Sequence, residues 1–175
     1  NIRVGRSETF LTEACEYTNS FLSFFPKISI ILNIDADHLD FFKDIDDIRH
    51  SFRLFAEKLP SDGTLIINSD TPAYEMIIKD LPCEVITYGL EHPAEYTAED
   101  ITYNELGHPS FICKRNNEVI GSFSLSVPGI HNVSNALAVI ALGVKLQMTP
   151  ENIQKGILQF TGTDRRFQYK GKIQV

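Results

Sequence analysis

Three short apolar runs, separated by segments with helical signals, constrain the fold of this chain more than any other feature. They cover residues 27–33, 64–68 and 83–88, and isoleucine, leucine and valine are frequent in them. A run that is apolar at successive positions is typical of a strand buried on both faces, as in a parallel sheet. The chain therefore predicts a β-α-β-α-β order, with parallel strands and right-handed crossovers.

The helical segments can be placed from their first residues. Asp44 is a favoured N-cap residue, and apolar side chains recur at helical spacing from there to about Leu59. Thr71 and Pro72 are predicted to begin a second helix, because proline is favoured at the first helical position. A further short strand is expected at residues 10–14, in the region of the acidic sequence E-A-C-E.

The second half of the chain has a different character. Residues 96–127 form short alternating segments with an Asn-Asn turn, which predicts antiparallel strands or hairpins. An apolar helix is expected after residues 128–135, and a last helix from Thr149 and Pro150 to just before Gly162. The predicted fold class is therefore α/β, with a mostly parallel sheet flanked by helices and a small antiparallel segment.

Composition and charge exclude several classes of protein. The 175 residues, 43% of them hydrophobic, suit one domain or one domain with the edge of another. The net charge of −7 argues against a nucleic-acid surface. Because no apolar stretch approaches the roughly 20 residues of a membrane span, we expect no membrane partner either. Three widely spaced cysteines without a C-x-x-C pair predict reduced thiols in a cytoplasmic protein and no zinc site.

The clearest candidate site follows the first apolar run. Residues 31–42 read I-L-N-I-D-A-D-H-L-D-F-F, so three aspartates and His38 come directly after a buried strand. Ligands bind at the ends of parallel strands, and carboxylates with an imidazole can hold a divalent ion against phosphate oxygens. Mg²⁺ needs only one or two direct protein ligands. The alternative is a solvated loop in which His38 caps the next helix, and these residues alone leave both interpretations open.

Two other groups of residues are weaker candidates. Glu13 and Glu16 follow the short strand expected before them, and one of them could share an ion with His38. Without other support, a solvated acidic loop is the simpler interpretation of these two glutamates.

The last third of the chain offers hydrogen-bonding side chains. His131, Asn132 and Asn135 lie at a helix start and could contact a nucleobase, although an asparagine there could also be a plain N-cap. Arg165 and Arg166 could place a guanidinium on a phosphate, or could simply be solvated.

The glycine-rich motifs that bind nucleotide phosphates are not found in this chain. Neither G-x-x-x-x-G-K-[ST] nor G-x-G-x-x-G occurs in it.

Taken together and in this order, these stretches resemble the Mur ligases, the ATP-dependent amino-acid ligases of peptidoglycan synthesis. The matching stretches are E-A-C-E-Y-T-N-S-F-L at 13–22, L-N-I-D-A-D-H-L-D at 32–40, P-G-I-H-N-V-S-N-A-L-A at 128–138 and G-T-D-R-R-F-Q at 162–168. The resemblance covers nearly the whole chain. It is strongest to the members that add L-alanine to UDP-N-acetylmuramate.

The resemblance implies a division of the chain. Residues 1–162 would form the central ATP-binding domain of a three-domain enzyme, with the phosphate loop of the family just upstream of residue 1. Residues 163–175 would form the junction to a C-terminal domain. The partners would then be UDP-N-acetylmuramate, L-alanine and the N- and C-terminal domains of the same protein, and we expect the chain alone to be inactive.

The resemblance also implies a site for ATP and Mg²⁺. Glu13 is the first choice, and Glu16 the second, for the Mg²⁺ between the ATP phosphates. His38 would hold a second Mg²⁺ near the substrate carboxylate, and Asn33 would position that loop.

The remaining candidates would bind the nucleotide. His131, Asn132 and Asn135 would contact the adenosine. Arg166, or else Arg165, would reach the nucleotide from the domain junction.

One departure from the family pattern is informative. Members that add later amino acids carry a carbamylated lysine on the helix after D-H-x-D, and that position falls here at about Phe52, followed by Arg53. The lack of a lysine agrees with the alanine-adding members and argues against a carbamate-bridged metal.

Three rival interpretations remain. Folylpolyglutamate synthetases share the architecture but match the E-A-C-E and R-R-F-Q stretches less well. A metal-dependent phosphoesterase could use the same D-x-D-H cluster. A non-catalytic nucleotide-binding module is the third alternative.

Overall fold

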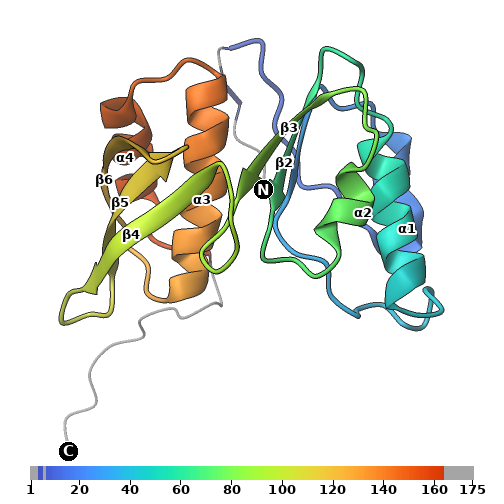
Figure 1. Cartoon of the computed structure of the whole chain (residues 1–175), viewed down its shortest axis with the longest axis horizontal. Coiled ribbons are helices and arrows are strands. Elements are labelled where there is room, and N and C mark those ends of the chain that lie inside the picture. Colours follow the sequence, from blue (N-terminus) through green and yellow to red (C-terminus); the bar gives the residue numbers. More distant parts are fainter. Residues whose placement is uncertain (1–3, 6, 164–175) are drawn as a thin grey trace, which may run out of the picture.

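In the described part of the chain, six strands form one sheet and follow one another in chain order, from β1 to β6 (Figure 1). The computed structural model describes residues 4–5 and 7–163. The strands are β1 (Ile28–Ile31), β2 (Thr64–Asn68), β3 (Glu84–Tyr88), β4 (Tyr96–Tyr103), β5 (Pro109–Arg115) and β6 (Glu118–Ser124). Strands β1 to β4 pair in parallel, and β4, β5 and β6 pair in antiparallel fashion. The predicted α/β class, with its antiparallel segment, is confirmed.

The helices cover both faces of this sheet (Figure 1). They are the 3-10 helix η1 (Tyr17–Ser23) and the α-helices α1 (Ile45–Ala56), α2 (Tyr74–Ile78), α3 (Ile130–Lys145) and α4 (Pro150–Gln159). The crossover helices α1 and α2 lie together on one face, while α3 lies on the other face and packs against β2 to β5. Among the helices that the structure describes, none combines the length and the apolar character needed to cross a membrane.

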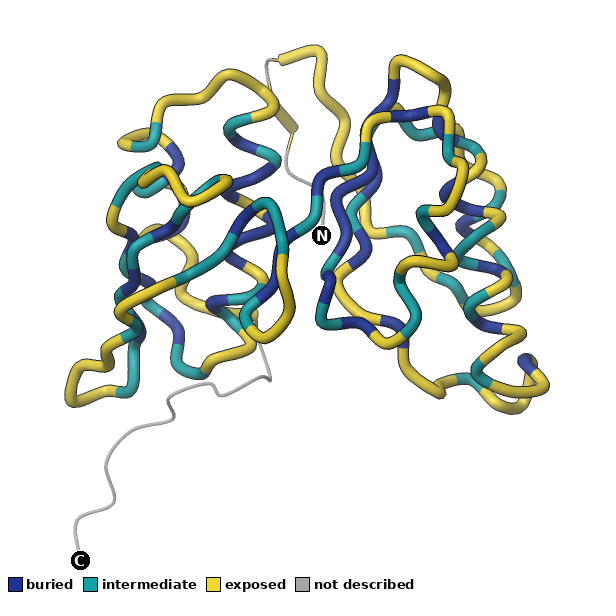
Figure 2. Tube along the Cα trace, viewed as in Figure 1, coloured by how far each residue is buried: buried dark blue, intermediate teal, exposed yellow. Residues whose placement is uncertain are grey.

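Strand β2 shows why its sequence is apolar at successive positions. Leu65 and Ile67 pack with the α1 and α2 layer, whereas Ile66 between them packs with α3. All three side chains are fully buried, and most of the trace along β2 is coloured as buried in Figure 2. A strand between two helix layers has no polar face, which explains the pattern.

Two of the predicted helix starts are confirmed by their caps. Asp44 Oδ1 accepts hydrogen bonds from the backbone N–H groups of Asp46 and Asp47, at 3.1 and 3.0 Å. Thr149 caps α4 by accepting from Asn152 N. Both side chains satisfy N–H groups that have no partner inside the helix.

Other predicted boundaries are wrong. Residues 10–14 form no strand in the structure, and Phe10 is 84% exposed, because no neighbouring strand among the described residues pairs with this segment. The second helix begins at Tyr74 instead of Thr71, because Ala73 adopts a left-handed conformation with φ of 64° just before it. Helix α4 ends at Gln159, three residues before Gly162.

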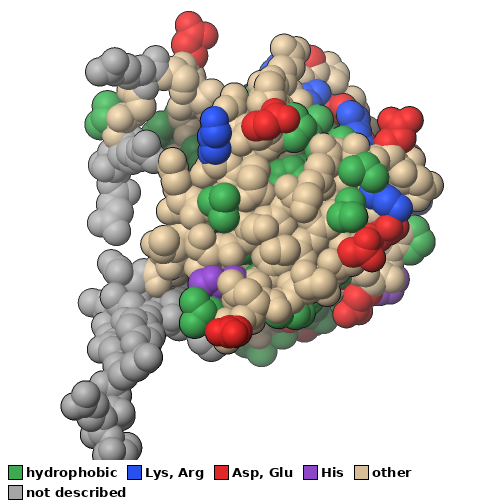
Figure 3. All heavy atoms as spheres, turned by 90° about the vertical axis from the view of Figure 1, so that its left-hand side faces the viewer, with side chains coloured by type: hydrophobic (Ala, Val, Ile, Leu, Met, Phe, Trp, Pro, Cys, Tyr) green, Lys and Arg blue, Asp and Glu red, His purple; other side chains and the backbone are tan. Residues whose placement is uncertain are grey.

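Charged side chains of both signs lie on the face shown in Figure 3. On the face seen in Figure 3, acidic and basic side chains are interspersed among polar and apolar ones. The charge on that face is therefore mixed, without a gathering of one sign.

Candidate functional site

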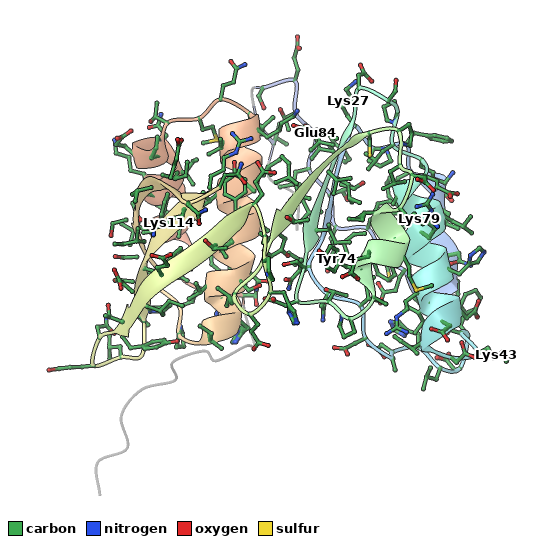
Figure 4. The ribbon with its side chains drawn as sticks, in the orientation of Figure 1. Lys27, Lys43, Tyr74, Lys79, Glu84 and Lys114 are labelled. Carbon is green, nitrogen blue, oxygen red and sulfur yellow. The ribbon has the colours of Figure 1, made fainter. Side chains whose placement is uncertain are left out.

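The polar residues of the candidate site lie at the carboxyl ends of β1 and β2. The loop at 32–44 follows β1 and contains the D-A-D-H sequence, and Asn68 ends β2. Figure 4 shows Lys43, in this loop, at one end of the domain, and Lys27 and Glu84, where β1 and β3 begin, at the opposite end. Because ligands of open α/β sheets bind at the carboxyl ends of the strands, this edge is the candidate site.

A strained turn holds His38 in its loop. Its backbone is left-handed, with φ of 53°, which costs a residue other than glycine about 1–3 kcal/mol. The N–H of His38 donates to Asp37 Oδ1 at 2.7 Å, and its carbonyl accepts from Phe41 N and Phe42 N at 2.9 Å each. Phe42 is 2% exposed and fixes the turn to the core. The backbone therefore determines where the imidazole can lie.

The segment that carries Glu16 is also held firmly. Asn19 is left-handed, with φ of 58°, and its Oδ1 accepts a hydrogen bond from Ser51 Oγ of α1 at 2.7 Å. Phe21 is 1% exposed and stacks on Phe55 of α1, with ring centroids 4.7 Å apart. Glu16 is thus presented from a segment that is fixed to α1 at two points.

The two segments meet at His38. His38 Nε2 lies 3.5 Å from Glu16 Oε1, and its Nδ1 lies 3.9 Å from Asp37 Oδ1. The ring of Tyr17 lies over the imidazole, with centroids 4.6 Å apart and planes tilted by 32°. The Tyr17 hydroxyl donates to Asp40 Oδ2 at 2.8 Å, and this hydrogen bond to an anion raises the pKa of Tyr17 above its usual value.

Two adjoining pockets open beside this group. One, of about 150 Å³, is lined by Glu16, Asn33, Ile34, Asp35, Asp37, Ile48 and Phe52. The other, of about 210 Å³, is lined by Asn33, Ile34, Asp35, Asn68, Asp70, Thr71 and Pro72. Phe52 therefore contributes an apolar ring to the first pocket. Its position is the one where some members of the family are expected to carry the modified lysine.

Asn68 was not among the predicted site residues, although it connects three parts of this edge. Its Nδ2 donates to Leu32 O at 3.1 Å and lies 3.5 Å from Ser134 Oγ, near the start of α3. Its Oδ1 accepts from Asp70 N at 2.9 Å. The signal in the sequence was that the first two apolar runs both end in asparagine.

Asp70 was missed as well, and it holds the loop between β3 and β4. Its carboxylate accepts from the backbone N–H groups of Leu90, Glu91 and His92 at 2.7, 3.1 and 2.8 Å. Burial by itself would raise the pKa of Asp70, but these hydrogen bonds and the one from the His92 ring outweigh it and lower that pKa. No local pattern around Asp70 indicates this role, because its partners lie about twenty residues further along the chain.

The first turns of α3 lie at the same edge, since Asn68 contacts that helix. His131 and Asn135 are exposed and lie four residues apart, which places them on one side of the helix. The Asn132 side chain instead donates to Pro128 O at 2.7 Å. The N-cap of α3 is Gly129, so neither asparagine has the capping role.

The other predicted site residues are placed as follows. Glu13 is exposed in a segment without regular structure, and it is Glu16 that lies beside His38. Asn33 is exposed, lines both pockets and has its Nδ2 3.5 Å from Asp35 Oδ2. Arg165 and Arg166 lie outside the described residues.

The Glu16 and His38 pair fits a divalent ion. Mg²⁺ binds its ligands at about 2.1 Å in an octahedron, so neighbouring ligand atoms lie about 3 Å apart. The 3.5 Å between Glu16 Oε1 and His38 Nε2 is close to that separation. Residues 4–5 and 7–163 contain no group of three or more His, Cys, Asp or Glu side chains that could hold a metal ion. Two protein ligands still suffice for Mg²⁺, because it retains several waters and binds substrate phosphates.

The fold and its polar edge define a class of protein: α/β domains that take a ligand at the carboxyl ends of their parallel strands. Within this class the chain belongs to the Mur ligase family, because the family model described as the Mur ligase middle domain matches residues 3–143.

Individual relatives agree with this assignment. The chain is 57% identical over 173 residues to a UDP-N-acetylmuramate–L-alanine ligase of Lachnospira eligens, with 98% of this chain and 38% of the relative covered. Its fold matches the UDP-N-acetylmuramate–alanine ligase MurC of Thermotoga maritima, with a TM-score of 0.74, 25% identity and coverage of 87% and 33% of the two chains. It also matches the MurF ligase of Thermotoga maritima in complex with ADP, with a TM-score of 0.67, 18% identity and coverage of 84% and 33%. The chain thus spans less than two fifths of the length of the curated relatives it matches.

Proposed function

We propose that this chain is the central, ATP-binding part of a ligase that joins L-alanine to UDP-N-acetylmuramate in cytoplasmic peptidoglycan synthesis. The observation that carries the proposal is the 57% identity, along 98% of the chain, to a ligase of that name. Because the chain spans 38% of that relative, the proposed activity is that of a longer parent protein. In this proposal the parent also has N- and C-terminal domains.

The chemistry of the proposed reaction explains what the site must do. A carboxylate is a poor electrophile, because its negative charge repels nucleophiles and its oxygen is a poor leaving group. Transfer of the γ-phosphoryl group of ATP forms an acyl phosphate and releases ADP. The amine of L-alanine then attacks the acyl carbon, loses a proton and expels phosphate. Aligning and neutralising crowded phosphate charge is the main requirement of such a step.

The described residues suit this requirement only with a cation present. Glu16, Asp35 and Asp37 would repel a triphosphate if they faced it alone, since like charges at close range are unfavourable. Glu16 and His38 would hold Mg²⁺, and Glu13 remains the alternative carboxylate from the same stretch. When bound, Mg²⁺ would neutralise negative charge on the phosphates. Asn33 would keep the loop after β1 in place beside the ion.

The nucleotide would extend from this edge towards α3. His131 and Asn135, exposed on one side of its first turns, are the proposed contacts to adenosine. Asn132 would contribute through its side-chain oxygen, because its Nδ2 donates to Pro128 O. Arg166, or else Arg165, would bring a positive charge to the phosphates from the junction with the next domain.

The proposal is tested on the full-length parent protein by following phosphate release from Mg-ATP with UDP-N-acetylmuramate, with L-alanine added last. Release that begins with L-alanine and yields the alanyl product supports the ligase. Sustained release without any amino acid would contradict it and favour a phosphoesterase. Dependence on a different acceptor, with no reaction of UDP-N-acetylmuramate, would favour another ligase of the superfamily, such as a folylpolyglutamate synthetase.

A further inference from the structure

The backbone pairing between β1 and β2 ends one residue before β2 itself ends. The last paired residues of the two strands are Ile31 and Ile67, whereas β2 continues to Asn68, which lies opposite Tyr88 of β3. Beyond this point side chains take over from the backbone. Asn68 Nδ2 donates to Leu32 O at 3.1 Å, and the Tyr88 hydroxyl donates to Ile31 O at 3.3 Å. The carboxyl end of β1 is therefore held by two side chains from the neighbouring strands.

The same amide group of Asn68 also reaches α3. Its Nδ2 lies 3.5 Å from Ser134 Oγ. Ser134 follows His131 by three residues and directly precedes Asn135, so it belongs to the turns that carry the proposed contacts to adenosine. The amide oxygen accepts from Asp70 N at 2.9 Å, which fixes the orientation of the amide. A single side chain thus joins the end of β1 to the first turns of α3.

We propose that Asn68 is a positioning residue, which keeps the loop after β1 and the first turns of α3 at a fixed separation and so prepares this edge for a nucleotide. The inference rests on the proposed binding of ATP at this edge and extends it. It does not depend on which side chains hold the cation. Tyr88 assists by holding Ile31 O, and neither side chain is a catalytic residue.

The separation matters because the proposed nucleotide contacts both parts of the edge. Its phosphates would lie beside the loop at 32–44, and its adenosine would lie against α3. These two segments are far apart in the sequence, and α3 packs on β2 to β5. A ligand that bridges two segments binds more weakly when they move independently, because their freedom is lost on binding. Asn68 reduces this cost by joining them before the ligand arrives.

Tyr88 is suited to its supporting role. It is fully buried, and its ring belongs to the core that packs with α3, so the hydroxyl at its tip has a fixed place. Burial raises the pKa of Tyr88 far above its usual value, and the hydroxyl therefore stays protonated and remains a donor to Ile31 O.

The test uses the full-length parent protein with substitutions numbered as here. Binding of a non-hydrolysable ATP analogue is measured by isothermal titration calorimetry at saturating Mg²⁺. Asn68→Ala is expected to weaken binding about tenfold. Asn68→Ser should lose as much, because a serine hydroxyl can accept from Asp70 N in the turn but is too short to reach Leu32 O. Tyr88→Phe keeps the buried ring and should cause a smaller loss.

A double-mutant cycle tests the link to α3. Ser134→Ala removes one partner of the amide and should weaken nucleotide binding by less than Asn68→Ala does. Because both substitutions remove the same contact, adding Ser134→Ala to Asn68→Ala should cause no further loss. Fully additive losses would overturn the proposed link between Asn68 and α3.

Another asparagine provides a matched control. Asn104 Oδ1 accepts from the backbone N–H groups of Leu106 and His108 at 2.9 and 3.0 Å, in the turn between β4 and β5. Asn104→Ala therefore also removes side-chain hydrogen bonds to the backbone, but away from the carboxyl ends of β1 and β2. It should leave nucleotide binding unchanged.

The outcomes separate this inference from the function on which it rests. If the unchanged parent protein binds the nucleotide and Asn68→Ala binds it equally well, the inference is overturned and the proposed function stands. Restored affinity in Asn68→Ser would also overturn it, since the turn at Asp70 alone would then explain the loss. If the unchanged protein binds no nucleotide, the proposed function and the inference fail together. Should Asn68→Ala not fold, unchanged binding in Asn68→Ser and Ser134→Ala would still contradict the inference.

Discussion

Left-handed backbone conformations occur at the two places that bring Glu16 and His38 together. Asn19, in the turn after Glu16, and His38 itself have φ of 58° and 53°. Such conformations persist only where the surroundings stabilise them, and here Ser51 and Phe42 belong to those surroundings. The two left-handed turns thus place the side chains of Glu16 and His38 next to each other.

His38 is the residue whose replacement should affect turnover most. We expect His38→Asn in the parent enzyme to lose roughly 100-fold in turnover, because the imidazole ligand is gone. Asparagine tolerates the left-handed backbone, so the unfolding temperature should stay close to that of the unchanged protein. His38→Ala should lose a similar amount of turnover and also about 1 kcal/mol of stability, because alanine fits φ of 53° less well. Near-normal turnover of either variant would remove His38 from the mechanism.

Asp70 gives a prediction that depends on pH. Its pKa is lowered in the folded protein, so its contribution to stability is fully present above the pKa of the unfolded chain, near 4. That contribution is lost as the pH falls through the lowered pKa. Amide hydrogen exchange of residues 89–95 should therefore lose protection in acid, after correction for the intrinsic exchange rate.

The matching variant removes the carboxylate. Asp70→Ala leaves three backbone N–H groups without their acceptor, which should cost this loop about 2 kcal/mol and speed its exchange about 30-fold at neutral pH. Exchange in other parts of the sheet should change less. Unchanged protection of the loop in Asp70→Ala would show that its conformation does not depend on Asp70.

The individual helices and strands show what a sequence pattern can predict. Runs such as 64–68 were identified correctly, because burial between two helix layers makes each successive residue apolar. The segment at 10–14 was predicted wrongly as a strand, since a strand also requires a partner and local composition does not report one. Likewise, the acidic stretch left Glu13 and Glu16 open, because only the turn through Asn19 decides which carboxylate reaches His38.

The packing of α3 on α4 leads to a paired prediction. A Cβ at Gly143 of α3 would lie 2.7 Å from Ile153 Cδ1 of α4, which is closer than side chains tolerate. Gly143→Ala should therefore destabilise the protein by about 1–3 kcal/mol. Gly156→Ala, on the exposed side of α4 with nothing within 4 Å, should stabilise it by about 0.5–1 kcal/mol. Chemical denaturation distinguishes the two, and equal effects would mean that the helices do not pack this closely.

Across the whole molecule, charge differs between the two ends of the strands. At the amino ends, acids are paired with lysines, as in the contact between Lys145 and Glu84 and the one between Lys27 and Asp62. At the carboxyl ends, Asp35 is one of several acids that line pockets without a lysine or arginine in the lining. An acidic edge of this kind repels polyphosphate and attracts divalent cations, so the proposed binding of ATP at this edge would require a metal ion.

We propose that His38 binds the divalent cation at this edge. The most direct measurement is electron spin echo envelope modulation of Mn²⁺ bound to the full-length parent protein with ADP. We expect modulation from a directly coordinated histidine nitrogen in the unchanged protein and its loss in His38→Asn. Nitrogen modulation that persists in His38→Asn, or that is absent from the unchanged protein, would show that His38 is not a ligand of the cation.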